Sequence, residues 1–518
     1  MTTLGAGAPA DGLPKRNRNT SPVVIQDVRI GLRGPTGDIR LADGLVTGFG
    51  DRAAVEPGDE VVRGAGGTLL PGLWDAHVHA LKWVEARGRI DVSGTTSPRH
   101  AVCVVADSQR DRSLPLAASE MLIGYGFRDG LWNERPDKSM LETALPGMAV
   151  ALVSNDMHTV WLSPQALRLI GWGDHPTGVL REGDAFRAQQ HFPAASTEET
   201  DRRLAQELQS TAAARGVTGL MDFEYADNIA DWSRRHQTEP LALRVACTVY
   251  PEYLEDAIER GLRTGQVLPM SDGMIEIGPL KVFVDGSLNT RTALCADPYP
   301  LDDENAPESH GMLLTETREL EHLVRRAFAH GIETAAHAIG DKANQLALDV
   351  FERVGCRGRI EHAQLLNPGD LRRFARLGVT AGVQPVHVLG DRDVADRLWA
   401  GRTARAFCYG PMVAAGVRIE IGSDAPVAPL DPWEGIAAAI SRTDGERSPW
   451  HPENAISLDD ALAAASRGRR RIRVGDAADL VLVETDPSHL TPRELPAIPV
   501  LGCMVAGQWT FRSADQMA

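Results

Sequence analysis

The residues with the clearest chemical potential are two histidines at the end of an apolar run. His77 and His79 close the segment TLLPGLWDAHVH, which begins at Thr68. In an extended strand, residues i and i+2 point to the same side, so both imidazoles would face one space. Neutral imidazole is a common metal ligand, and two rings aimed at one point are half of a catalytic metal site. Alone, the pattern is also typical of an ordinary polar strand end.

Four further apolar runs carry a side chain that can bind metal or move a proton. One contains a lysine, two end in histidine and one ends in aspartate; these residues are Lys281, His337, His362 and Asp424. Each also fits a structural role, such as a buried histidine, a surface pair of Glu361 with His362, or a helix N-cap at Asp424. One shared site explains all five runs more simply than five separate roles.

The elements that must position these side chains alternate between strand and helix. Eight strand candidates cover residues 68–76, 217–223, 241–250, 275–284, 332–337, 358–362, 379–384 and 418–424. Helical patterns lie between several of them, at 317–330, 342–354 and 368–377. This alternation indicates a parallel sheet, and eight units predict an α/β fold of the (β/α)₈ barrel type. In such a barrel, catalytic residues come from the carboxyl ends of different strands, where the candidates lie.

The chain is longer than one barrel needs, and the excess lies in three places. Residues 22–66 and 466–518 consist of short strands with glycine turns, and we expect them to pack together as a small β-sandwich beside a barrel of residues 67–465. Residues 85–215 form a long insertion after the first barrel strand, which we expect to cover the active site. Residues 1–21 read as a disordered leader.

Substrate contacts are expected from the insertion and from the ends of two other strands. For the two tryptophans, packing inside the insertion explains the sequence equally well. The candidates are His158, Trp161 and Trp132 in the insertion, Gln384 and His387 after the seventh strand, and Arg291 and Thr292 after the fourth.

Six segments in order resemble the amidohydrolase superfamily and, within it, the amidohydrolase 3 (YtcJ-like) group. They are LLPGLWDAHVH, KVFVDGSLNTRTA, HAIGDKANQLALD, RIEHAQ, GVQPVH and IGSDAPVAPLDPW, and the resemblance runs from about residue 22 to 511. It implies a site for two zinc ions, in which Lys281 is carbamylated and bridges the ions. The implied ligands are His77, His79, Lys281, His337, His362 and Asp424.

Lys281 also has an argument of its own. Only five of the 54 basic residues are lysines, and the other 49 are arginines. A chain so biased towards arginine is expected to keep lysine where a guanidinium cannot replace it. A buried lysine amine can lose its proton and then add carbon dioxide to become an anionic carbamate. The alternative is a buried lysine paired with Asp285 or Glu276.

The chemistry follows from the ligand types. Imidazole and carboxylate oxygens suit zinc, with manganese or iron as substitutes, and two ions can activate a shared water and polarise a carbonyl. Asp424 would take the proton of the water and pass it to the leaving nitrogen. The expected reaction is hydrolysis of a C–N bond in an amide, N-acyl or N-formyl amine, outside peptide bonds. Two alternatives remain: a mononuclear deaminase of a heterocyclic amine, which needs no strand-4 lysine, and a non-catalytic barrel scaffold.

Charge and composition limit the partners. The net charge of −16 argues against nucleic-acid binding, and no apolar run approaches the ~20 residues of a membrane span. The N-terminal residues lack the apolar core of a secretory signal. The six cysteines are scattered, as in reduced cytosolic proteins, so we expect a cytoplasmic protein. The expected partner is a small-molecule substrate, with a homodimer left open.

Overall fold

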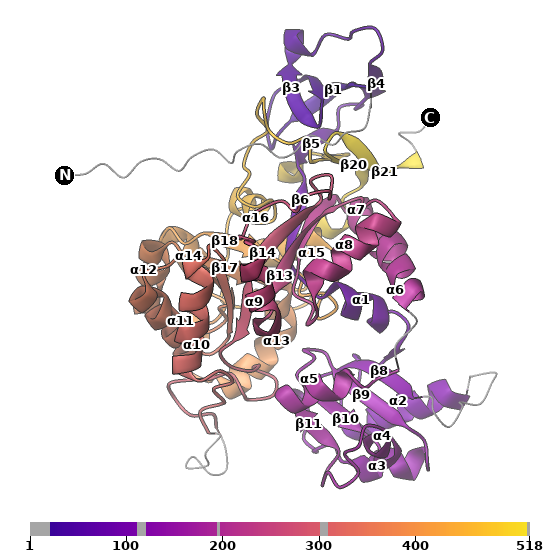
Figure 1. Ribbon diagram of the computed structural model, residues 1–518, viewed down its shortest axis with the longest axis vertical. Helices are drawn as coiled ribbons and strands as arrows, with labels where there is room; N and C mark the ends of the chain where they lie inside the picture. Colours follow the sequence, from indigo (N-terminus) through magenta and orange to yellow (C-terminus); the bar gives the residue numbers. More distant parts are fainter. Residues whose placement is uncertain (1–20, 111–120, 194–196, 301–308, 515–518) are drawn as a thin grey trace.

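Three parts follow one another along the long axis of the computed structural model, which describes residues 21–110, 121–193, 197–300 and 309–514 (Figure 1). A sheet built from the terminal segments lies at one end, the barrel in the middle, and the insertion at the other end. The expected leader, residues 1–21, lies outside the described residues apart from residue 21. No helix in the described ranges is long and apolar enough to cross a membrane.

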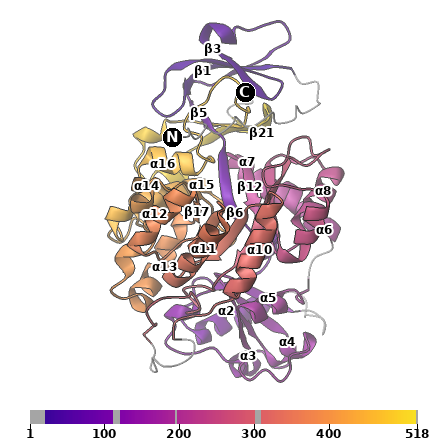
Figure 2. The same cartoon turned by 60° about the vertical axis from the view of Figure 1, so that its left-hand side comes forward.

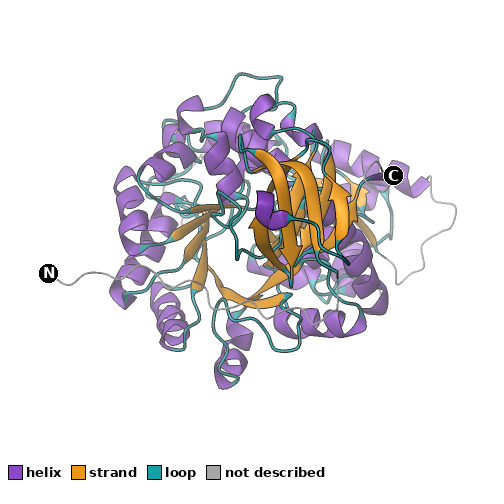
Figure 3. Cartoon of the chain, turned by 90° about the horizontal axis from the view of Figure 1, so that it is seen from above, coloured by secondary structure: helices purple, strands orange, loops and turns teal. Residues whose placement is uncertain are grey.

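The predicted barrel is confirmed as eight neighbouring parallel strands. A bridge between Val78 and Ala425 brings the last strand back to the first. Helices surround the strands when the molecule is viewed along its long axis (Figure 3). In spatial order the strands are β6 (Leu73–Val78), β12 (Val217–Asp222), β13 (Arg244–Val249), β14 (Ile275–Phe283), β15 (Thr334–Ala338), β16 (Arg359–His362), β17 (Thr380–Val383) and β18 (Ile419–Ile421).

The helices that cover the barrel are amphipathic. α10 (Thr317–Ala329), for example, buries Leu320, Val324 and Ala327, which lie on one helical face. α11 (Asp341–Val354) and α12 (Pro368–Leu377) end at Gly355 and Gly378, and both glycines adopt the left-handed conformation typical of a helix end. The three helices match the predicted ranges. The others are α8 (Asn228–Thr238), α9 (Leu254–Glu259), α13 (Pro385–Leu398), α14 (Tyr409–Ala414), α15 (Pro432–Ser441) and α16 (Leu458–Ala464).

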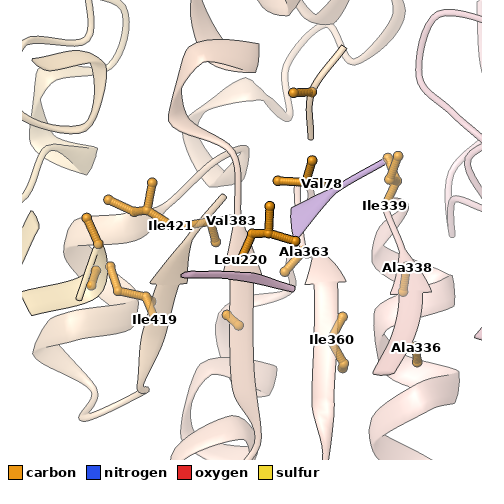
Figure 4. Packing of buried hydrophobic residues seen from close by; sticks show 14 of the residues in the cluster. Val78, Leu220, Ala336, Ala338, Ile339, Ile360, Ala363, Val383, Ile419 and Ile421 are labelled. Atoms are coloured by element: carbon orange, nitrogen blue, oxygen red, sulfur yellow. The ribbon is translucent and has the colours of Figure 1, made fainter. Parts of the chain in front are cut away.

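Strand alternation aims the site residues inwards. In β15, Ala336 and Ala338 pack into the core between strands and helices, so His337 between them points to the other face (Figure 4). Ile360 and Ile419 belong to the same core on β16 and β18. A smaller apolar cluster, which includes Ala335 and Phe223, fills the barrel interior. The barrel thereby holds polar side chains at its mouth above a packed floor.

The two ends of the chain combine in one eight-stranded sheet, because β5 and β19 pair antiparallel at its centre. The apolar run 68–76, predicted as one strand, forms two: β5 belongs to this sheet and β6 to the barrel. The break falls at Gly72, where a Cβ atom would lie 2.3 Å from the side chain of Thr218. The strands are β1 (Val23–Ile30), β2 (Thr36–Ala42), β3 (Leu45–Phe49), β4 (Glu60–Arg63), β5 (Thr68–Pro71), β19 (Leu480–Val483), β20 (Val500–Val505) and β21 (Gln508–Arg512).

The insertion has its own five-stranded sheet and lies at the end of the barrel away from the terminal sheet (Figure 2). Because β6 leads from the terminal sheet towards the insertion, this is the end where the barrel strands finish. Its strands are β7 (Ile90–Asp91), β8 (Leu122–Phe127), β9 (Val150–Ser154), β10 (Thr159–Leu162) and β11 (Val179–Arg181). The helices from β6 to β12 are α1 (Ala80–Ala86), α2 (Pro98–Arg110), α3 (Lys138–Ala144), α4 (Pro164–Leu169), α5 (Gly183–Gln189), α6 (Thr197–Arg203) and α7 (Gln209–Ala214).

Candidate metal centre

The six residues predicted as metal ligands meet at the mouth of the barrel. β6 presents His77, and His79 follows it at the start of α1; β14, β15 and β16 each contribute one residue, and Asp424 lies three residues beyond β18. All except His79 are buried. The residues from β14, β15 and β16 are Lys281, His337 and His362.

Asp424 is the centre of this arrangement. Its Oδ1 atom lies 3.3 Å from His79 Nε2 and 3.7 Å from His77 Nε2. Its Oδ2 atom lies 3.8 Å from His387 Nε2 and 4.0 Å from His362 Nδ1. The donor atoms form two groups that are compact enough to hold an ion: His77, His79 and Asp424, and His362, His387 and Asp424. His387, expected as a substrate contact, therefore lies as close to the carboxylate as His362.

The backbone is strained where it aims two of these side chains. Asp424 and His362 are in the left-handed region, with φ values of 59° and 72°, a conformation that is uncommon for non-glycine residues and in which Asp and His are enriched. The Asp424 N–H donates a hydrogen bond of 2.7 Å to the His77 carbonyl, which fixes the loop after β18 to β6. Gly422 permits this approach, since a Cβ atom there would lie 2.5 Å from the His77 backbone nitrogen.

Several buried donor atoms of this centre lack hydrogen-bond partners, which is expected of atoms that bind a divalent cation. His77 Nε2, His387 Nε2 and Asp424 Oδ1 are buried and have no hydrogen-bond partner in the described part of the chain, which is costly unless a ligand compensates. Burial lowers the pKa of His77 to about 4 and holds the pKa of His337 and His362 well below the usual value. Neutral rings are the form that binds metal, and nitrogen with oxygen donors suits zinc, manganese or iron.

Neighbouring side chains fix which ring nitrogen faces the centre. Glu361 Oε2 accepts a 2.7 Å hydrogen bond from His77 Nδ1, and Gln384 Oε1 accepts one of 2.9 Å from His362 Nδ1. His77 therefore keeps Nε2 free on the side of Asp424, whereas the His362 nitrogen that contacts Gln384 is also the one 4.0 Å from Asp424 Oδ2. Glu361 also binds Arg359, which forms a second buried ion pair with Glu420 at 2.8 Å. Sequence reasoning gave Glu361 no functional role, although it lies beside His362.

Lys281 occupies an aromatic pocket without a carboxylate partner. Its Nζ atom lies 4.6 Å from the ring centre of Phe223 and 5.0 Å from that of Phe283. Burial lowers its pKa to about 8. The two expected alternatives are occupied elsewhere, because Glu276 binds Arg467 at 2.7 Å and Asp285 accepts three backbone N–H groups. No ion pair of Lys281 occurs within the described ranges.

The insertion adds a second polar network at the mouth. His158 Nδ1 donates to Glu182 Oε2 at 2.6 Å, and the His158 ring lies 5.5 Å from the His337 ring. Burial opposes the charge of His158, but Glu182 outweighs it and raises the pKa to about 9. Asp156 Oδ2 accepts from Ser287 Oγ at 2.6 Å, which joins the insertion to the loop after β14. Glu182 and Asp156 were not predicted, since their partners are distant in sequence.

The remaining substrate candidates lie in different surroundings. Gln384 supports His362, and Thr292 belongs to the network of Glu182. Trp161 is fully buried in the core of the insertion, where its ring centre lies 6.4 Å from that of Trp132. Arg291 is not among the residues that line the two cavities at the mouth.

The chain resembles several known proteins along most of its length. The chain matches the model of the amidohydrolase family over residues 60–511, which confirms the predicted resemblance. YtcJ of Bacillus subtilis (strain 168) is 26% identical over 92% of this chain and 96% of its own length. N-substituted formamide deformylase of Arthrobacter pascens is 24% identical over 95% of each chain. An uncharacterized metal-dependent hydrolase from Pyrococcus horikoshii OT3 shares the fold, with a TM-score of 0.73 and 23% identity over 91% of this chain and 99% of the other. Because the family match spans most of its length, the chain belongs to the amidohydrolase family.

Proposed function

We propose that this amidohydrolase hydrolyses the C–N bond of an amide, an N-acyl amine or an N-formyl amine at a centre of two divalent metal ions, most simply zinc. The observation that carries the proposal is the position of Asp424, whose two oxygens each face two histidine nitrogens within 4.0 Å. Six convergent donors exceed the three or so protein ligands of a single catalytic zinc. The unsatisfied buried atoms of His77 and Asp424 support the same view.

The ions would be held by His77, His79, Lys281, His337, His362 and Asp424. A divalent ion bound there supplies a Lewis acid that lowers the pKa of water and polarises a carbonyl oxygen. His387 is close enough to Asp424 Oδ2 to contribute a further nitrogen or to contact substrate.

Lys281 would enter this centre as a carbamate. The neutral amine forms a bond from Nζ to the carbon of dissolved carbon dioxide and releases a proton, which leaves an anionic carboxylate on the side chain. The absence of a carboxylate partner for Lys281 in the described ranges, and the aromatic rings around it, favour the neutral amine. The same lysine counts against a mononuclear deaminase, which needs none at this position.

Asp424 would move the proton. Its carboxylate accepts a proton from the attacking water as the oxygen bonds to the carbonyl carbon. It then delivers that proton to the nitrogen as the C–N bond breaks and the nitrogen keeps the electron pair. The products are a carboxylate and an amine. His158, held by Glu182, would donate a hydrogen bond that orients the substrate. The Arthrobacter pascens relative, named an N-substituted formamide deformylase, supports C–N cleavage as the reaction class.

Metal removal and reconstitution test this function. We expect chelator-treated protein to release no amine from N-benzylformamide, and activity to return as zinc is added up to about two ions per chain. Lys281→Ala should lower the number of bound ions. Full activity in metal-free protein would refute the proposal. A single ion per chain that is unaffected by Lys281→Ala would refute the binuclear centre, and inert, metal-free protein would favour the scaffold alternative.

A further inference from the structure

A buried glutamate, Glu224, lines the cavity of about 330 Å³ that opens beside the candidate metal centre. Glu224 lies two residues beyond the end of β12 and is 6% exposed. It belongs to neither of the two donor groups around Asp424. The metal centre and the proton transfer therefore leave this carboxylate without a task.

One oxygen of Glu224 is bound and the other faces no partner. Glu224 Oε2 accepts a 3.0 Å hydrogen bond from the Lys82 backbone N–H at the start of α1. Neither an ion pair of Glu224 nor a hydrogen bond to its Oε1 atom occurs in the described part of the chain. Burial raises the pKa of Glu224 above its usual value, although Lys82 and His79 oppose this rise. A buried carboxylate without a cationic partner is costly, so Oε1 is open to a charged donor from the cavity.

The lysine beside Glu224 is already paired. Lys82 lines the same cavity, but its Nζ atom lies 3.2 Å from Glu85 Oε2. No ion pair joins Lys82 to Glu224 within the described ranges. The negative charge of Glu224 is therefore only partly compensated by the protein itself.

Aromatic rings line the cavity next to Glu224. Tyr225 follows it in the chain, and Tyr250, Phe283 and Phe186 continue the same wall. Successive ring centres lie 4.6, 6.4 and 5.8 Å apart, so the wall is continuous from the barrel to α5 of the insertion. The faces of aromatic rings attract cations, and a carboxylate forms its strongest hydrogen bonds with charged donors. Together they suit an ammonium or guanidinium group.

We infer that Glu224 is a specificity-determining residue and that the substrates are amides carrying a positively charged group, such as an alkylammonium ion. The inference rests on the proposed function, because the same cavity reaches Asp424, where the C–N bond would break. The charged group donates a hydrogen bond to Glu224 Oε1 and lies against Tyr225 and Tyr250. It takes no part in bond breaking, so one of the two products, the carboxylate or the amine, retains it.

Pairs of amides that exchange an ammonium group for a methyl group test the recognition of charge. 6-Amino-N-methylhexanamide and N-methylheptanamide differ in this way on the acyl half, whereas N-(5-aminopentyl)acetamide and N-hexylacetamide differ on the amine half. The exchanged group is remote from the amide, so the two members of a pair have similar intrinsic reactivity. For the zinc-loaded protein we expect kcat/KM to be at least about tenfold higher for the ammonium member of one pair or both, since a hydrogen bond between charged groups contributes about this factor.

A variant of Glu224 locates this preference. Glu224→Gln keeps an acceptor for the Lys82 N–H and removes the charge, so the two kcat/KM values of a pair should come within about twofold of each other. A general loss of activity or of zinc would leave their ratio unchanged, because both members use the same centre. Glu255→Gln is the matched control. It also removes one negative charge, but Glu255 is exposed, binds Arg326 at 2.7 Å and does not line the cavity, so the preference should persist.

Equal or faster hydrolysis of the neutral member in both pairs would overturn the inference and leave the proposed function intact. A preference that survives in Glu224→Gln, or that Glu255→Gln abolishes equally, would do the same. Hydrolysis of N-benzylformamide alone would overturn only the inference, whereas no hydrolysis of any of these amides would overturn both.

Discussion

Replacing Glu361 by glutamine should weaken metal binding without any direct contact with the ion. Glu361 Oε2 accepts from His77 Nδ1 at 2.7 Å, its other oxygen accepts from Arg359 Nε, and the side chain is fully buried. A glutamine has one acceptor where two donors need one each, so it must leave either His77 or Arg359 unsatisfied. His77 then loses the contact that fixes its tautomer and ring orientation.

The expected loss of zinc affinity is about tenfold to a hundredfold, which corresponds to about 1.4–2.7 kcal/mol. Competition with a chromophoric chelator measures it directly, without any substrate. Glu420→Gln is a matched control, because Glu420 is buried and binds the same Arg359 at 2.8 Å, and it also binds Arg418. Both variants should lower the thermal stability of the metal-free protein, since each removes a buried partner of Arg359.

Only Glu361→Gln should weaken zinc binding. Unchanged affinity in Glu361→Gln, or an equal loss in both variants, would refute the role assigned to the Glu361–His77 contact.

Three further outcomes are expected. Asp424→Asn keeps the shape of the side chain but cannot accept the proton of water, so kcat should fall by about 10²–10⁴ while circular dichroism and much of the metal content persist; a loss of only a few-fold would contradict the shuttle. His158→Ala should impair turnover with unchanged zinc content, whereas His79→Ala should reduce both, as measured by plasma emission and steady-state kinetics; normal turnover in His158→Ala would leave that residue a packing role. Glu182→Gln should resemble His158→Ala in impairing turnover with unchanged zinc content, because the 2.6 Å contact orients His158, and normal turnover would argue against that contact.

Much of the fold could be predicted because the signals are local. The helices 317–330, 342–354 and 368–377 follow from apolar spacing and terminal glycines, and they agree with α10, α11 and α12. The division of the run after Thr68 into β5 and β6 could not be predicted. The two halves pair with strands far apart in the sequence, β5 with β1 and β19 and β6 with β12.

The candidate site also contains some residues that could be placed from the sequence and others that could not. His77, His337 and Asp424 could be placed together because strand ends converge in a barrel, whatever the details of packing. The partner of His77 could not, because Glu361 lies 284 residues away and any of several acidic residues would fit the sequence equally well. Trp161 shows another limit of sequence reasoning. A tryptophan suits both a core and a pocket, and the structure places Trp161 in the core of the insertion.

We propose that the six residues hold two metal ions bridged by a modified lysine. A crystal structure of zinc-loaded protein grown with bicarbonate, with anomalous data collected above and below the zinc edge, tests it most directly. We expect two anomalous peaks between His77, His79, His337, His362 and Asp424, with density for a carboxyl group on Lys281 Nζ between them. A single peak beside an unmodified Lys281, or peaks away from these side chains, would contradict it.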